Sequence, residues 1–434
     1  MPGSRPPEKS LGFLSVTSIG LGGMIGGGIF ALLGLAVSLA HGGTPVAFLV
    51  GGLVALVTAY SYAKLSVAYP SQGGTVEFIN QAFGEGIVTG ALNILLWMSY
   101  VVMLSLYSYA FGSYAASFFP AGAQGILHHV FLTAILLLIT GLNLMGARAV
   151  GRLETYIVGI KLAILLLFCI AGSWSIERSS LQPATWSPAL DLLAGGMIIF
   201  VAYEGFELIA NTAQDVRRPE KNLPRAYYAS VILVACIYIA VAAVTVGNLS
   251  LDDISRAQDY ALAEAARPFL GQFGFSLIGM AALLSTSSAI NATLYGTARV
   301  SYIIAKEGEL PQELERQVWK QPVEGLIITA SLTIVVANLL DLTSIAAMGS
   351  SGFLIIFAAV NLANYRLATK TGANRAIAIG GVAACSMALA SMAISVAGSS
   401  PMSILVIICM IAVSLGIEIT YRRYSGRTIK PVLR

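Results

Sequence analysis

Among the ionisable side chains inside the long apolar segments of this sequence, three are the first candidates for chemistry. Lys161 lies near the middle of segment 150–174, and Glu204 and Glu207 lie in segment 192–213. A charged side chain at the centre of a bilayer costs at least ~2.5 kcal/mol, so each should face the protein interior. Residues of this kind mark proton, ion or substrate pathways in membrane proteins.

Lys161 is predicted to lie near the membrane midplane. With segment 150–174 starting at Val150, a rise of 1.5 Å per residue puts Lys161 roughly 16 Å into a core about 30 Å thick. From that depth its amine cannot comfortably reach either interface, so backbone carbonyls or hydroxyls should receive it. Two interpretations remain open, a proton carrier and a structural lysine held by a partner.

Glu204 and Glu207 are three residues apart, which places them on one helical face. Two carboxylates on one face inside the membrane are costly unless they line a cavity or pair with other groups. Ser285 and Ser288 lie in another apolar segment, 275–305, where helix packing and an ion or proton site are equally good interpretations.

Glycines interrupt the two segments that should hold the binding site. Gly26, Gly27 and Gly28 stand together in the first segment, and a glycine inside a helix costs about 1 kcal/mol relative to alanine. An unwound backbone survives in a membrane only where protein, ions or a ligand satisfy it, so the break is a candidate carboxylate site. The alternative is close helix packing, because the glycine spacing also fits a small-xxx-small motif. The second interruption is expected around Gly195, Gly196 and Gly205.

The composition requires a polytopic membrane protein around these residues. Hydrophobic residues make up 57% of the 434 residues and charged residues only 11%, with a mean hydropathy of +0.80. About twenty apolar residues span a bilayer, and the sequence predicts twelve such helices. They are expected at 11–39, 45–68, 87–118, 125–145, 150–174, 192–213, 226–246, 275–305, 325–340, 343–365, 376–397 and 403–421.

Lysines and arginines set the orientation of these spans. With the N-terminus inside, 21 of the 25 fall in inner segments, three in outer segments, and Lys161 is the one left. Both terminal tails, 1–10 and 422–434, are therefore predicted to be cytoplasmic, and the net charge of +4 needs no nucleic acid to explain it. The four cysteines are scattered singly within spans, so neither disulfides nor metal ligands are expected.

The two interruptions occupy corresponding places if the first ten spans form two sets of five. Paired broken helices indicate a transporter built from inverted repeats, with its site near the midplane. We therefore expect repeats at 11–174 and 190–366, followed by two extra helices at 376–421.

Several motifs resemble those of the amino acid-polyamine-organocation family of secondary transporters. They lie at 26–30 (GGGIF), 69–74 (YPSQGG), 200–207 (FVAYEGFE) and 218–225 (RPEKNLPR). Within the family, the similarity is greatest to the archaeal proton-coupled, broad-specificity amino-acid transporters, through 89–100, 149–152, Lys161 and 305–311.

The resemblance implies the five-plus-five inverted-repeat fold first seen in sodium-coupled leucine transport. In that fold the amides of Gly27 and Gly28, beside Gly26, would bind the substrate carboxylate. Carbonyl oxygens would hold its ammonium group, at Met24, Ile25, Phe200, Val201 and Glu204, and Phe200 would close over the substrate. The amine of Lys161 would replace a sodium ion near the Gly22 carbonyl and a hydroxyl of Ser285 or Ser288. Glu207 matches a recurrent acidic position, whereas Glu204 departs from the apolar residue expected there.

The functional expectation is proton-coupled amino-acid symport of broad specificity, by alternating access in the cell membrane. Alternatives are an amino-acid or polyamine exchanger without proton coupling, a sodium symporter, and a membrane substrate sensor that does not transport. No serine-histidine pair, metal-ligand spacing or phosphate-binding loop suggests an enzyme, and no cofactor is expected. Whether the substrate is neutral or cationic, and whether the protein is a monomer, stays open at this point.

Overall fold

The computed structural model describes residues 10–84, 86–145, 150–306, 323–399 and 401–425. Over these residues the chain is helical, with two isolated β-bridges and no strand. This confirms the all-α prediction; the predicted tails lie almost wholly outside the described residues. The principal helices are α1 (Phe13–Met24), α2 (Gly28–Ala40), α3 (Thr44–Ala68), α4 (Thr75–Phe83), α5 (Ile87–Ala116), α6 (Ala121–Leu144), α7 (Val150–Ser173), α8 (Ala189–Ile198), η3 (Ile199–Asp215), α9 (Pro219–Asn248), α12 (Arg267–Lys306), α13 (Val323–Leu339), α14 (Leu342–Arg366), α16 (Arg375–Ser399) and α17 (Pro401–Ser425).

Ten of the described helices are long and apolar enough to cross a membrane, and the bent pair α1 and α2 adds an eleventh candidate. Helix α13 coincides with the expected ninth span but has only 17 residues. The polytopic prediction is therefore confirmed, while the count of twelve spans and the division into inverted repeats remain predictions.

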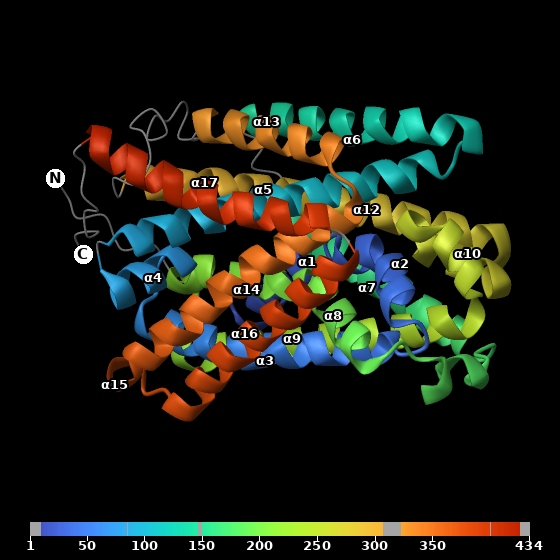
Figure 1. The fold of residues 1–434 in the computed structure, drawn as a ribbon, viewed down its shortest axis with the longest axis horizontal. Coiled ribbons are helices and arrows are strands. Elements are labelled where there is room, and N and C mark those ends of the chain that lie inside the picture. The colour runs from blue at the N-terminus through green and yellow to red at the C-terminus, as the bar shows by residue number, and fades with distance from the viewer. Residues whose placement is uncertain (1–9, 85, 146–149, 307–322, 400, 426–434) are drawn as a thin grey trace.

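The long helices run in roughly the same direction, and the interrupted helices lie among them (Figure 1). Helices α6 and α13 form one side of the bundle, α3 and α9 the opposite side, and α1, α8 and α14 lie between. The most thoroughly buried spans are α5, α8 with η3, and α14, whereas α16 and α17 bury fewer than a third of their residues. The core therefore consists of the helices that carry the candidate site.

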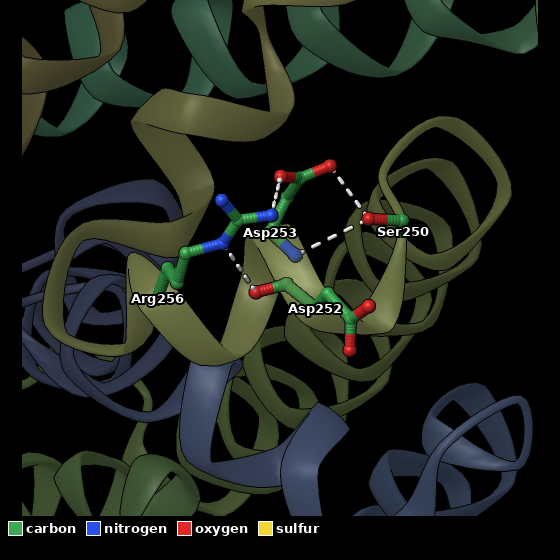
Figure 2. A network of polar contacts seen from close by, with 4 residues as sticks. All are labelled: Ser250, Asp252, Asp253 and Arg256. Atoms are coloured by element: carbon green, nitrogen blue, oxygen red, sulfur yellow. Dashed lines mark hydrogen bonds and ion pairs between the residues drawn. The ribbon is translucent and has the colours of Figure 1, made fainter.

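Short helices close the two ends of the bundle. Helix α4 is amphipathic and buries Val76, Phe78 and Ile79 on one face. At the other end, α10 (Leu251–Arg256) begins after Ser250, whose hydroxyl accepts a hydrogen bond from the Asp253 amide at 3.2 Å. Figure 2 shows Arg256 turned back onto Asp253, 3.0 Å away. The acidic stretch around α10 is thus partly neutralised by its own arginine.

The second interruption takes a different form from the expected gap. The chain passes at Ile199 from α-helix directly into η3, a 3-10 helix of 17 residues. Because a 3-10 helix has three residues per turn, side chains at i and i+3 line up along one edge. Glu204 and Glu207 therefore still share a face, as their spacing predicts.

Candidate substrate and coupling site

The break between α1 and α2 covers Ile25, Gly26 and Gly27, and the two helices meet at 45°. The glycine cluster thus interrupts the first span, as predicted. No acceptor is described for the backbone N–H groups of Gly27 and Gly28. They lie at the N-terminus of α2, where unpaired amides and the helix dipole favour an anion. Binding of a carboxylate at this end of α2 stays a prediction.

Close packing explains why these positions are glycine. A Cβ on Gly27 would lie 2.2 Å from Cδ1 of Tyr107, and one on Gly28 would lie 2.8 Å from Cα of Ala202. Likewise, a Cβ on Gly205 would lie 2.2 Å from the carbonyl carbon of Gly23. The packing and binding interpretations therefore do not exclude each other, because η3 approaches α1 and α2 closely where the backbone opens.

Hydroxyl groups from distant helices already satisfy several carbonyl oxygens of the break. The Tyr238 hydroxyl on α9 lies within hydrogen-bond distance of the carbonyl oxygens of Met24 (2.6 Å) and Ala202 (3.2 Å). On α12, the Ser285 hydroxyl lies 2.5 Å from the Ile25 carbonyl and also contacts that of Gly26. At the break, side-chain hydroxyls therefore replace part of the regular backbone hydrogen bonding of a helix.

The start of η3 is fixed by a serine of α14. The Ser350 hydroxyl donates to the Ile198 carbonyl at 2.6 Å and accepts from the Val201 amide at 3.2 Å. Beside it, the ring of Phe200 packs edge-on against Phe357, with centroids 5.8 Å apart. Phe200 and Val201 thus lie in the core beside the break, and closure of Phe200 over a substrate stays a prediction.

The two carboxylates of η3 have contrasting environments. Glu207 is 1% exposed and accepts hydrogen bonds from Tyr62 (3.2 Å), Thr75 (3.0 Å) and Tyr100. Glu204 is 2% exposed and accepts one long bond, from the Tyr107 hydroxyl at 3.4 Å. Glu207 is therefore well satisfied, and Glu204 is not.

Lys161 points into the bundle and reaches the first helix. Its side chain is 1% exposed, and Nζ donates to the Gly22 carbonyl at 3.2 Å. Ser288 is also buried, one helical turn beyond Ser285 on α12. The structure therefore brings Lys161 to α1 three residues before the break, while its part in proton coupling stays a prediction.

Tyrosines are the residues of this site that sequence reasoning missed or misassigned. Aromatic residues at the spacing of Tyr100 and Tyr107 are more often packing or interface anchors, but here their hydroxyls donate to the two carboxylates. Their seven-residue spacing, two turns of one helix, was an available signal, because a buried tyrosine hydroxyl needs a partner. Tyr238 and Ser350 carried no comparable local signal.

Comparison with known proteins agrees with this architecture. The sequence profile of the family described as amino acid permease matches residues 11–415. An uncharacterised protein of Methanocaldococcus jannaschii is 40% identical over 373 residues, 86% of each chain. An inner membrane transport protein of Escherichia coli is 36% identical over 423 residues, 96% of this chain and 97% of the relative.

A more distant relative is the methylthioribose transporter of Bacillus subtilis, 25% identical over 383 residues, 83% of this chain and 81% of the relative. The relatives with a named function are thus transporters, and the chain is a transporter and not an enzyme. Its many apolar helices agree with a multi-pass membrane protein. Fold, glycine break and profile lead to one conclusion: the chain belongs to the amino acid permease family of membrane transporters.

Proposed function

We propose that this transporter is a proton-coupled amino-acid symporter of broad specificity that works by alternating access, as in the archaeal branch it resembles. It would lie in the cell membrane with both termini in the cytoplasm. The observation that carries the proposal is the hydrogen bond from Lys161 to the Gly22 carbonyl, next to the break. A titratable amine there can link proton binding to the position of α1.

The substrate would bind through its carboxylate at the amides of Gly27 and Gly28. Two features support this role: those N–H groups have no described acceptor, and the dipole of α2 favours negative charge there. Phe200 and Val201 would border the substrate from η3.

Protonation of Lys161 would strengthen its hydrogen bond to the Gly22 carbonyl of α1. A hydrogen bond to a charged group contributes about 1.5–3 kcal/mol, roughly twice a neutral one. Losing that difference changes a conformational equilibrium by about tenfold, since 1.4 kcal/mol corresponds to a factor of ten. The protonated state would hold α1 to α7, and loss of the proton toward the cytoplasm would release α1 and open the inner path.

Uptake by the purified protein in liposomes tests this function. With no amino acid inside and the membrane potential clamped, an inward proton gradient should drive labelled alanine or lysine, each assayed separately, above its external concentration, and collapsing the gradient should abolish that accumulation. Equal uptake with and without the gradient would exclude proton coupling.

The same liposomes distinguish the alternatives. An exchanger would need internal substrate, and a sodium symporter would need a sodium gradient. A sensor would bind amino acids without flux. Because a relative is named for methylthioribose, that compound belongs in the competition series beside the amino acids. The oligomeric state, for which a monomer is the simplest case, is measured on the same sample.

A further inference from the structure

Glu204 carries a buried oxygen with no partner beside the proposed binding site. Its Oε2 is fully buried and lacks a hydrogen bond, and its Oε1 has only the 3.4 Å contact with Tyr107. Among the described residues, no lysine or arginine forms an ion pair with it. A buried carboxyl oxygen without a hydrogen-bond partner is costly, so we expect a group from outside the protein to bind to it.

Tyr107 links Glu204 to the break. Cδ1 of its ring, near its own backbone, packs against Gly27, while the hydroxyl at the far end of the ring contacts Glu204. A substrate whose carboxylate lies at the Gly27 and Gly28 amides has its α-amine directly next to that carboxylate. A group that meets Glu204 must instead extend about the length of a tyrosine ring, as the side-chain amine of lysine does.

The charges in the site favour the same kind of substrate. In a neutral amino acid the α-amine balances the α-carboxylate, so an ionised Glu204 would have no compensating charge. The second carboxyl group, that of Glu207, is satisfied by three hydroxyls, and the Lys161 amine donates to the Gly22 carbonyl. Because an uncompensated buried charge is strongly unfavourable, a second positive group on the substrate would stabilise the closed site.

We infer that Glu204 selects cationic amino acids by pairing with their side-chain amine. This assignment rests on the proposed function in one respect, since it takes the substrate carboxylate to lie at the helix break. The site would then prefer lysine-like amino acids to neutral ones, and would discriminate most strongly against acidic ones.

Lysine and norleucine test the inference, because they have the same carbon chain and differ in the terminal amine. We expect the wild-type protein to bind lysine at least tenfold more tightly than norleucine, and glutamate more weakly than either. Glu204→Gln keeps the size and removes the charge; it should erase the preference for lysine, because lysine loses its partner and norleucine no longer faces an uncompensated carboxylate. Glu177→Gln, at an exposed loop position, is the matched control and should behave as wild type.

Equal affinities for lysine and norleucine in the wild type, or failure of lysine to bind, would overturn the inference without any variant. A Glu204→Gln protein that still prefers lysine would also overturn it. Equilibrium binding needs no proton gradient, so these outcomes are separate from the coupling test. If lysine selectivity depends on Glu204 but a gradient drives no accumulation, the inference stands and the proposed coupling fails.

Discussion

The substitution Gly205→Ala tests whether the close approach of η3 to α1 shapes the site. Its Cβ would lie 2.2 Å from the Gly23 carbonyl carbon and 2.4 Å from the Met24 nitrogen. Both are backbone atoms, so a change of side-chain rotamer cannot relieve the clash. To reach an ordinary contact of 3.4 Å, α1 and η3 would have to separate by roughly 1 Å.

Overpacking of this kind costs about 1–3 kcal/mol, and the gain from glycine to alanine in a helix returns at most about 1 kcal/mol. We therefore expect Gly205→Ala to lower the apparent Tm in detergent and to weaken amino-acid binding. The control is Gly159→Ala on α7, where a Cβ meets nothing within 4 Å and the propensity gain should appear alone. If Gly205→Ala matches Gly159→Ala in Tm and in affinity, the close approach of the two helices is refuted.

Two further substitutions test the Tyr238 hydroxyl at the break and the half-buried carboxyl group of Asp259. Tyr238→Phe removes the hydrogen bonds to the carbonyl oxygens of Met24 and Ala202, which should lower the free energy of unfolding by about 1 kcal/mol. Tyr156→Phe, on the exposed face of α7, is the control and should leave it unchanged. Equal Tm values for the two variants in thermal unfolding would exclude the role of Tyr238. Burial raises the pKa of Asp259 above 3.8, although Ser113 donates to it at 3.4 Å. Because its folded pKa is the higher one, its proton stabilises the fold at low pH, and this contribution is lost as pH rises through the folded pKa. The Tm of wild type relative to Asp259→Asn should therefore rise from about pH 7 to about pH 4, and a constant difference would contradict this assignment.

The parts of the structure that the sequence predicts well depend on strong local effects. A charge or three adjacent glycines in an apolar span has a large energetic consequence wherever the span packs, so the buried Lys161 and the break at Gly26 and Gly27 could be foreseen. The amphipathic pattern of α4 likewise needs no tertiary information.

What the sequence could not predict depends on contacts between distant residues. Tyr238 lies 214 residues from Met24 along the chain, and Ser350 lies 149 residues from Val201. Nothing in their local sequence indicates these partners. The 3-10 form of η3 was also missed, because helix propensity and hydropathy do not separate it from an α-helix.

Gradient-driven uptake by a Lys161→Ala protein tests the central claim most directly. Lys64→Ala is its control, since Lys64 on α3 also donates to a backbone carbonyl, that of Gly372 at 3.2 Å, but at an exposed site. Under an inward proton gradient with the membrane potential clamped, wild type and Lys64→Ala should concentrate labelled alanine or lysine in liposomes, whereas Lys161→Ala should only bring either one to equilibrium. Accumulation by Lys161→Ala at the wild-type level would contradict the account.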